Sequence, residues 1–419
     1  MTALRSLLHH HDVTWIASAT TDEDRVVAAE RAGGDVVLVA HDPVAYDDYY
    51  NVVANPMLWF LQHSLWGRAL RPDLGPDFHR AWHDGYVAVN RTFADAVVAE
   101  LDNNPGAQVF FHDYHLYLAP RFVREARPDA TLSHFVHVPW PVDWTILPAE
   151  LRYAIHDGLL ANDVVGFHTE RWARNFERSC ADVCGGTRDA LVTHHAISVD
   201  VGEFEALAAS RPVLAEETTL PRPEKLIVRV DRTDPSKNAV RGFRALALLL
   251  ERHPEWRGRV KMLALLDPSR QEIPEYVQYL EAVEATVREV NERFDDVIEL
   301  RVADNFPASV AAYKQFDVLL VNPVYDGLNL VAKEAPLVNT RDGVLVLSEN
   351  AGVHEEIGEW ALTVNPFDIE GQAEALHEAL TMGEEERRRR RSAIVAHVRR
   401  NDVARWISRQ LADVDRVTA

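Results

Sequence analysis

The stretch "KLIVRVDRTDPSKNAV", residues 225–240, shows the pattern on which the fold depends. An apolar run of strand length passes through a short polar loop into a helical pattern that extends from about Lys237 to His253. The same succession recurs along most of the chain. Further strands are predicted for "VTWIAS" (13–18), "DVVLVA" (35–40), "AQVFFH" (107–112), "TLSHFVHV" (131–138), "DVVGFH" (163–168), "VKMLALL" (260–266), "VIELRV" (297–302), "DVLLVN" (317–322) and "GVLVLS" (343–348). Alternation of this kind is typical of βαβ units around a mostly parallel sheet, so the sequence predicts an α/β protein.

The length of the chain predicts two domains, because 419 residues exceed what one hydrophobic core usually organises. The segment "RPVLAEETTLPRPE" (211–224) is rich in proline and acidic residues and has no sustained period, which is typical of a linker. We expect a Rossmann-like N-terminal domain over residues 1–212 and a Rossmann-like C-terminal domain over residues 213–395. A final helix over residues 396–419 is expected to pack back towards the first domain. Two doubly wound domains that face each other form a deep cleft, and ligands bind beyond the carboxyl ends of the strands.

The composition excludes several classes of protein. A formal net charge of -21 argues against a broad nucleic-acid surface or anionic-membrane surface. No apolar run approaches the roughly 20 residues that span a bilayer, and the N-terminus lacks the features of a signal peptide, so we expect a cytoplasmic protein. Cys180 and Cys184 are interpreted as ordinary thiols in a reducing compartment, since two thiols cannot complete a four-ligand zinc site. Any anion must therefore be bound at a local cationic site.

Two candidate loops follow strands in the N-terminal half. In "FFHDYHLYLAP" (110–120), His112, Asp113 and His115 suggest a metal site, but alternate residues of an extended segment diverge and no matching ligand set follows. A carboxylate at the carboxyl end of a strand suits a hydroxyl-rich substrate better. In "HFVHVPWPVDW" (134–144), His137 ends a strand, and a structural role is as well supported there as a catalytic one.

Two more candidate loops follow strands in the C-terminal half. Arg232 and Lys237 flank the start of a helix, where free N–H groups already favour an anion, and together they form a cationic cradle of diphosphate size. Two exposed surface cations are the alternative. In "VNPVYDGLNLVAKEAPLVN" (321–339), Asp326-Gly327 permits a tight turn, Asn329 can cap the next helix, and Glu334 can accept hydrogen bonds from ribose or serve only that helix. No G-x-G-x-x-G or G-x-x-x-x-G-K-[ST] motif occurs, which argues against dinucleotide oxidoreductases and P-loop enzymes.

Several of these segments together carry a resemblance to one family. "DDYYNVVANPMLW", "HDYHL", "HFVHVPWP", "DVVGFHTE", "VDRTDPSKN" and "YDGLNLVAKE" resemble, in order and spacing, the trehalose-6-phosphate synthases, retaining glycosyltransferases of family 20 with the two-domain GT-B fold. The resemblance runs from about Val13 to the C-terminus. It implies that the family's first strand and glycine-rich loop are missing from the N-terminal domain. The segments "RTDPSKN" and "EAPLVNTRD" are more similar to the pseudo-glycosyltransferase that makes validoxylamine phosphate from a GDP-linked cyclitol, which favours GDP as the nucleotide.

The resemblance implies roles for individual residues. Arg232 and Lys237 would hold the donor diphosphate, Glu334 the donor ribose, and His137 the donor sugar. The donor site would further include Asp326, Gly327, Leu328, Asn329, Leu330 and Val331. Asp113 would lie between donor and acceptor, and the acceptor phosphate would be held by Tyr50, Trp59 and Arg270.

The resemblance also implies a reaction. Glucose would pass from GDP- or UDP-glucose to glucose 6-phosphate by front-face displacement with retention, without a metal, a cofactor or a dedicated protein nucleophile. One alternative is the pseudo-glycosyltransferase, which couples a GDP-cyclitol to an aminocyclitol phosphate. Another is a catalytically silent sensor of nucleotide sugars or sugar phosphates. The expected partners are these small molecules, and a homo-oligomer stays open.

Overall fold

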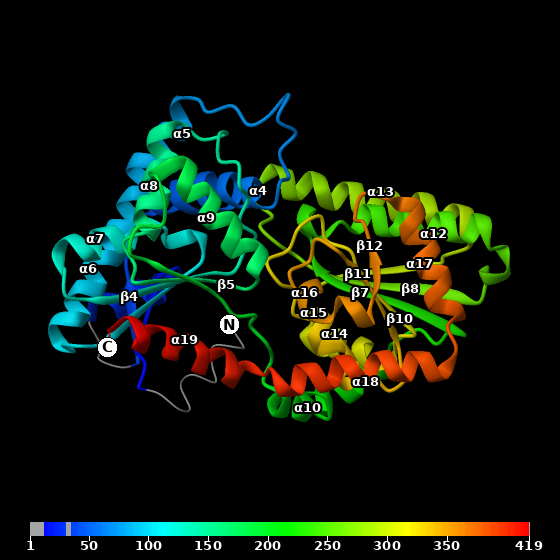
Figure 1. The fold of residues 1–419 in the computed structure, drawn as a ribbon. Helices are drawn as coiled ribbons and strands as arrows, with labels where there is room; N and C mark the ends of the chain where they lie inside the picture. Colours follow the sequence, from blue (N-terminus) through cyan, green and yellow to red (C-terminus); the bar gives the residue numbers. More distant parts are fainter. Residues whose placement is uncertain (1–11, 31–34, 419) are drawn as a thin grey trace. The chain divides into compact units, whose positions relative to one another are not determined.

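A computed structural model describes residues 12–30 and 35–418. The chain forms two compact units, which are described separately. Unit 1 comprises Met1–Ala196 and Trp406–Ala419, and unit 2 comprises Ile197–Arg405 (Figure 1). Both units are built from parallel strands connected by helices, which confirms the predicted α/β class. Within the described residues, no helix is long and apolar enough to cross a membrane.

Unit 2 contains one six-stranded parallel sheet in the order β12-β11-β10-β7-β8-β9. Its strands are β7 (Lys225–Arg232), β8 (Val260–Asp267), β9 (Ile298–Val302), β10 (Val318–Val321), β11 (Val344–Ser348) and β12 (Leu362–Val364). The chain first adds strands on one side of β7 and then crosses to add β10, β11 and β12 on the other. The strand order therefore reverses between β7 and β10, and open α/β sheets bind ligands at such a switch point. The loops that carry Lys237 and Asp326 follow these two strands.

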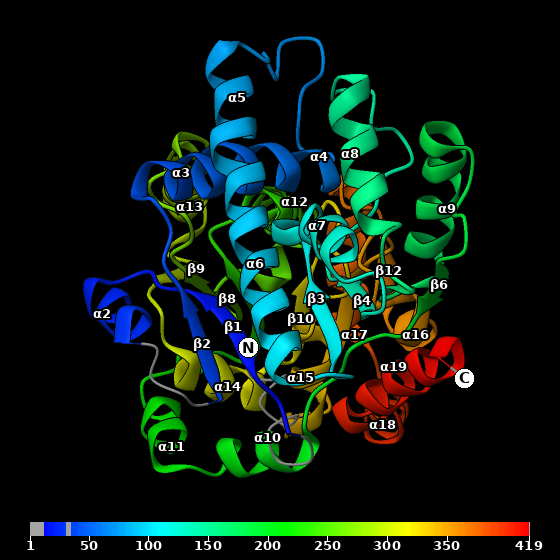
Figure 2. The same ribbon diagram turned by 90° about the vertical axis from the view of Figure 1, so that its left-hand side faces the viewer.

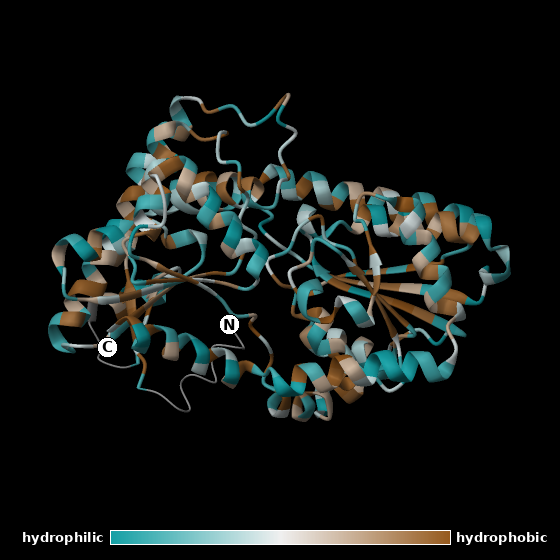
Figure 3. Ribbon diagram, in the orientation of Figure 1, coloured by the Kyte–Doolittle hydropathy of each residue, from teal (hydrophilic) through white to brown (hydrophobic). Residues whose placement is uncertain are grey.

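Helices cover both faces of this sheet. On one face lie α12 (Ala239–Arg252), α13 (Pro274–Phe294) and α17 (Ile369–Thr381), and on the other α14 (Phe306–Gln315), α15 (Val331–Val338) and α18 (Glu384–Arg400) (Figure 1). Unit 2 also contains α10 (Val201–Ala208), α11 (Arg211–Glu217), α16 (His354–Ile357) and the 3-10 segments η5 (Pro235–Lys237), η6 (Pro254–Trp256) and η7 (Gly358–Trp360). The strands are apolar along most of their length because both faces are buried (Figure 3).

Unit 1 contains a four-stranded parallel sheet, β3-β4-β5-β6, and a separate parallel pair, β1-β2 (Figure 2). The strands are β1 (Trp15–Ser18), β2 (Val36–Val39), β3 (Gln108–His112), β4 (Thr131–Val136), β5 (Val164–Phe167) and β6 (Leu191–His194). The helices are α2 (Asp22–Glu30), α3 (Pro43–Asp47), α4 (Trp59–Gln62), α5 (Pro76–Arg80), α6 (Ala88–Asn103), α7 (Ala119–Ala126), α8 (Ala149–Leu159) and α9 (Glu170–Cys184), with π-helical segments η2 (Asp48–Leu58) and η3 (Ala81–Val87) and the 3-10 segment η4 (Tyr114–Leu116). One apolar cluster joins α6 and α7 to β3 and β4. The expected loss of a first strand and glycine-rich loop concerns residues before Val13, and residues 1–11 lie outside the described part of the chain.

The units divide between Ala196 and Ile197, earlier than the boundary predicted at residues 212 and 213. Part of the predicted linker is helical, because Pro212 lies in the first turn of α11, where a proline is tolerated, and Val213 is fully buried. The chain returns to unit 1 within α19 (Val403–Thr418), and the indole of Trp406 donates a hydrogen bond to the carbonyl of His195 at 3.1 Å.

Cys180 and Cys184 are both free thiols, and burial raises the pKa of each.

Candidate functional site

The loop after β7 positions the two cations predicted for the diphosphate. Arg232 is the last residue of β7, and Lys237 is the last residue of η5. Asn238 follows with φ 62° and ψ 35°, and its side-chain amide donates to the carbonyls of Asn322 (2.9 Å) and Pro366 (2.8 Å). Buried bonds of this kind fix the loop between β7 and α12, so the conformation of the cationic segment is set by the neighbouring strand ends.

A buried arginine in β7 also supports the loop that carries Lys237. Arg229, in the middle of β7, has no exposed surface, and its guanidinium donates to the Lys237 carbonyl (2.9 Å) and to Oδ2 of Asp231 (2.7 Å). Burial raises the pKa of Asp231, which Arg229 opposes. The only sequence signal for this support is a charged residue inside an otherwise apolar strand.

Asp234 brings two arginines together. Its side chain is fully buried, and its Oδ2 lies 3.8 Å from Nη2 of Arg232 and 3.7 Å from Nη1 of Arg270. The Arg270 guanidinium also donates to the hydroxyl of Tyr276, which lies 3.3 Å from the same carboxylate oxygen. One carboxylate thus offsets the repulsion between two like charges. Sequence reasoning missed Asp234, although it stands between the two predicted cations.

The loop after β10 carries most of the predicted donor residues. Lys237 Nζ lies 2.5 Å from Oδ2 of Asp326, and the side-chain amide of Asn329 donates to the same oxygen at 3.1 Å. Asn329 has φ 87°, and its Oδ1 accepts from the amide of Ala332 in the first turn of α15 at 3.3 Å, but the N-cap position of that helix is Leu330 rather than Asn329 as predicted. Gly327 and Leu328 lie between these two side chains, and Leu330 and Val331 begin the helix. At the switch point, the ion pair between Lys237 and Asp326 therefore joins the loop after β7 to the loop after β10.

Glu334 lies in the first turn of α15. Burial raises the pKa of its carboxyl group from 4.5 to about 7, against a lowering hydrogen bond with Tyr313. A carboxyl that titrates near neutral pH can both donate and accept hydrogen bonds, which suits a vicinal diol. The neighbouring Lys333 is fully buried and pairs with Glu356 at 2.6 Å.

In unit 1, three histidines form a chain at the carboxyl ends of β3, β4 and β5. Nδ1 of His112 lies 3.1 Å from Nε2 of His137, and Nδ1 of His137 lies 3.2 Å from Nε2 of His168. Burial lowers the pKa of His112 to about 4 and that of His137 well below its usual value, so both rings are neutral at pH 7. Both ring nitrogens of His137 are therefore engaged, which supports the structural role that the sequence left open. A polar contact from this ring to a sugar has to displace one of these bonds.

Asp113 follows β3 in an unusual backbone conformation. Its φ of 66° and ψ of 179° fall in a region that is occupied almost solely by glycine. Its amide donates to the carbonyl of Phe135 (2.8 Å), its carbonyl faces Nε2 of His134 (3.0 Å), and its Oδ1 accepts from the amide of His137 (3.3 Å). Strain of this kind persists only where the surroundings over-determine it, and it concentrates at functional sites.

The predicted acceptor residues fall into different units. Tyr50 lies in η2 and stacks on His115, with ring centroids 5.9 Å apart, and buried Trp59 packs on Tyr114 at 5.6 Å. Both aromatic residues thus contact the loop that contains Asp113. Arg270 belongs to unit 2, where it lies beside Arg232. Within unit 2, Asp234 lies between Arg232 and Arg270, and Lys237 pairs with Asp326.

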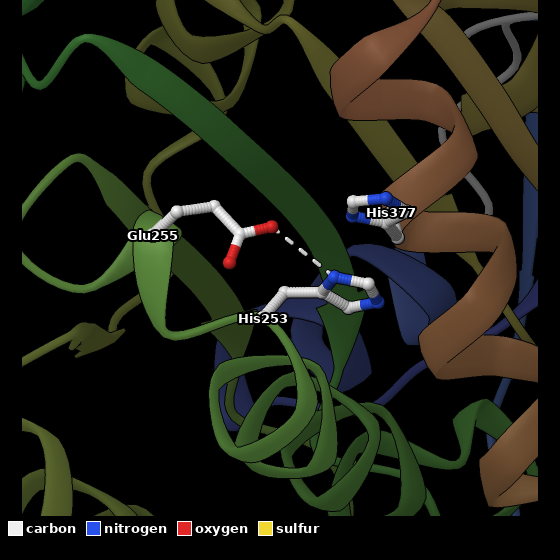
Figure 4. A group of neighbouring side chains, drawn as sticks. All are labelled: His253, Glu255 and His377. Atoms are coloured by element: carbon white, nitrogen blue, oxygen red, sulfur yellow. Dashed lines mark hydrogen bonds and ion pairs between the residues drawn. The ribbon is translucent and has the colours of Figure 1, made fainter.

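Away from these loops, one group in the described part of the chain has side chains spaced for a metal ion. His253, Glu255 and His377 have potential ligand atoms within 4.8 Å of one another (Figure 4). The two imidazoles, however, are stacked with centroids 3.5 Å apart and 9° between their planes, and their in-plane lone pairs do not converge on one point. The indole of Trp256 donates to Nδ1 of His377 at 3.3 Å, and Nδ1 of His253 lies 3.2 Å from Glu255. This group is a polar contact between η6 and α17 rather than a metal site in this arrangement.

Comparisons with known proteins identify the family. The model of glycosyltransferase family 20 matches residues 1–416. A validamine 7-phosphate valienyltransferase of Streptomyces hygroscopicus is 33% identical over 96% of this chain and 85% of its own length. A trehalose-6-phosphate synthase of Mycolicibacterium smegmatis is 33% identical over 97% of this chain and 84% of its own length.

Solved structures agree with these relatives. A UDP-forming α,α-trehalose-phosphate synthase of Burkholderia vietnamiensis superposes with a TM-score of 0.82 at 26% identity, covering 97% of this chain and 99% of that one. A Burkholderia xenovorans enzyme in complex with glucose 6-phosphate gives 0.81 at 26% identity, covering 96% and 100%. The chain belongs to glycosyltransferase family 20, and it is a retaining hexosyltransferase of the trehalose-6-phosphate synthase type with the GT-B fold.

Proposed function

We propose that this enzyme transfers glucose from a nucleoside-diphosphate glucose to glucose 6-phosphate with retention and forms trehalose 6-phosphate. The observation that carries the proposal is the cationic loop at the switch point of unit 2, where Arg232 ends β7 and Lys237 pairs with Asp326 of the loop after β10. A diphosphate is the ligand that this charge and position suit best. A relative solved with glucose 6-phosphate supports a sugar-phosphate acceptor.

The charges of the site support a displacement without a protein nucleophile. The bond from C1 of glucose to the diphosphate oxygen breaks, and its electron pair leaves on the nucleoside diphosphate. The acceptor hydroxyl oxygen bonds to C1 from the same face, and its proton passes to the departing phosphate. Arg232 and Lys237 would stabilise the negative charge that develops on the leaving group. Lys237 would then exchange its present partner, the Asp326 carboxylate, for a phosphate oxygen. We expect the reaction to need neither a metal nor a cofactor, because these side chains supply the positive charge.

The nucleotide is the finer part of the proposal. The similarity of residues 232–238 and 334–342 to the cyclitol-coupling enzyme favours GDP, while UDP-forming enzymes are among the structural relatives. A guanine or uracil base would be chosen by contacts outside the diphosphate loop, since Arg232 and Lys237 contact only the phosphates in this proposal.

A second candidate is the coupling of a GDP-cyclitol to an aminocyclitol phosphate. The observation in its favour is the 33% identity to the valienyltransferase over 96% of this chain. The same diphosphate loop would serve this reaction. The two functions differ in both the donor and the acceptor, so turnover of a nucleoside-diphosphate glucose with glucose 6-phosphate separates them.

The experiment is a nucleotide-release assay with purified enzyme, glucose 6-phosphate and, separately, UDP-, GDP- and ADP-glucose, with and without EDTA. The disaccharide phosphate is identified by mass. Product with one donor, at an unchanged rate in EDTA, is the expected result and names the nucleotide. Binding of a nucleoside diphosphate without any product would overturn the synthase proposal and favour the cyclitol-coupling enzyme or a silent sensor. A rate that collapses in EDTA would overturn metal independence alone.

A further inference from the structure

We propose that His134 is a positioning residue that holds the backbone of Asp113 in its strained conformation. The inference rests on the proposed function only in assigning Asp113 a place beside the reacting sugars. His134 lies in β4, where it has no exposed surface, and its Nε2 lies 3.0 Å from the Asp113 carbonyl oxygen.

The hydrogen-bonding pattern fixes the tautomer of His134. A carbonyl oxygen only accepts, so Nε2 must carry the proton and donate. Burial lowers the pKa of His134 to about 3, so the ring is neutral at physiological pH and Nδ1 carries no proton. Nδ1 is buried and has no hydrogen-bond partner among the described residues. Among the described residues, the bond to Asp113 is therefore the one hydrogen bond that the ring nitrogens make.

An apolar aromatic ring would fit the surroundings of His134 better than an imidazole does. The ring packs against Phe111 at 6.0 Å and Tyr117 at 5.6 Å between centroids. A phenyl ring would keep this packing. It would also remove Nδ1, a buried polar atom without a partner that lowers the stability of the fold. The single donated bond to Asp113 is what a phenyl ring would lack, so this bond is the reason we assign to the histidine.

The bond blocks a specific relaxation of the loop. Rotation of the peptide between Asp113 and Tyr114 changes ψ of Asp113 from 179° towards the values of the left-handed helical region, which Asp tolerates much better at φ 66°. That rotation turns the Asp113 carbonyl away from His134. The backbone amide of Leu116 lies 3.4 Å from the same carbonyl oxygen, so His134 makes the shorter of these two bonds. Without its imidazole N–H, the loop is expected to relax and to move the start of η4.

The test compares His134→Phe, which keeps the packing without a donor, with His134→Gln, which restores a side-chain N–H. Under the proposed function, His134→Phe should lower kcat by about 10- to 100-fold, the scale of a small displacement at a reacting centre, with both KM values little changed. His134→Gln should recover most of that loss. An unchanged kcat in a folded His134→Phe variant would overturn the inference.

A double-mutant cycle separates positioning from a general structural role. If His134 acts through Asp113, then His134→Phe should cost much less in an Asp113→Asn background than in the parent enzyme. Equal losses in the two backgrounds would contradict the inference. Thermal unfolding of all four proteins confirms that the comparison is made on folded enzyme.

Hydrogen exchange gives a readout that does not need activity. In the parent enzyme and in His134→Gln, the amides of residues 113–116 should exchange slowly, and in His134→Phe they should exchange faster, while peptides of unit 2 stay unchanged. If the parent enzyme shows no transfer, the proposed function fails, and this comparison still decides the role of His134. Identical exchange in all three proteins would reject it.

Discussion

The guanidinium groups of Arg232 and Arg270 approach the same carboxylate oxygen, Oδ2 of Asp234, at 3.8 and 3.7 Å. Arg232 ends β7 and Arg270 follows the neighbouring parallel strand β8, so the two residues lie at the same edge of the sheet. In the proposed reaction one arginine would bind the donor diphosphate and the other the acceptor phosphate. Asp234 would then set the spacing between the two anionic groups.

Arg232→Ala should remove most of the transfer activity without unfolding the enzyme. The side chain is 39% exposed, so its removal opens no cavity, and the loss of one charge at the leaving group is expected to lower kcat by about 10²–10³-fold. The assay is nucleotide release under saturating substrates. Arg244→Ala, which removes an exposed cation from α12, is the matched control and should retain full activity. Near-normal turnover of Arg232→Ala would remove Arg232 from the diphosphate site.

Arg270→Ala should raise the KM for the acceptor far more than the KM for the donor. The prediction follows from the proposed contact between Arg270 and the acceptor phosphate, while Arg232 and Lys237 still hold the donor. Initial rates are measured with each substrate varied against a saturating concentration of the other. An equal rise in both KM values would place Arg270 outside the acceptor site.

Glu334→Gln should make the enzyme more stable at pH 8 than the parent, with little difference at pH 5. The native carboxyl has a pKa of about 7, whereas the unfolded one has an ordinary value of 4.5, so unfolding releases a proton between these pH values. The stability that Glu334 contributes is thus present below about pH 4.5 and lost as the pH rises through 7. The loss amounts to about 3 kcal/mol at most, because solvent at the partly exposed side chain screens part of it.

Urea unfolding at pH 5 and pH 8 measures this difference directly. Glu378→Gln, which changes an exposed carboxyl on α17, serves as the control and should shift stability equally at both pH values. A Glu334→Gln variant that behaves like the control would show that the Glu334 carboxyl titrates normally in the folded enzyme.

Asp113→Gly should be more stable than Asp113→Ala. Glycine usually costs about 0.5–1 kcal/mol relative to alanine, but at φ 66° and ψ 179° the alanine Cβ is strained and glycine is not. The order of stability should therefore be reversed by about 1–3 kcal/mol. Chemical denaturation of the two variants measures it, and both should lose most, though not all, of their activity if Asp113 lies beside the reacting sugars. Alanine proving the more stable would mean that the loop relaxes at no cost.

Much of the fold and part of the site could be predicted from local patterns. Apolar runs that alternate with helical periods predict parallel βα units, and the carboxyl ends of such strands predict which loops carry the site. Arg232, Lys237, Asp326 and Glu334 lie where that reasoning places them, at or after the switch-point strands. The helix α11 inside the predicted linker was harder to predict. A short helix that begins with a proline has a composition similar to that of a loop.

The sequence by itself determined the α/β class, the family and the loops that carry charge, since these depend on residue type and on spacing along the chain. Only the tertiary structure decided how distant residues are combined. Three contacts depend on which strands are neighbours and in what register. They are the carboxylate of Asp234 shared by two arginines, the hydrogen-bonded rings of His112, His137 and His168, and the bond from His134 to Asp113. Strand neighbours are selected by packing over the whole sheet, so no local stretch of sequence specifies them.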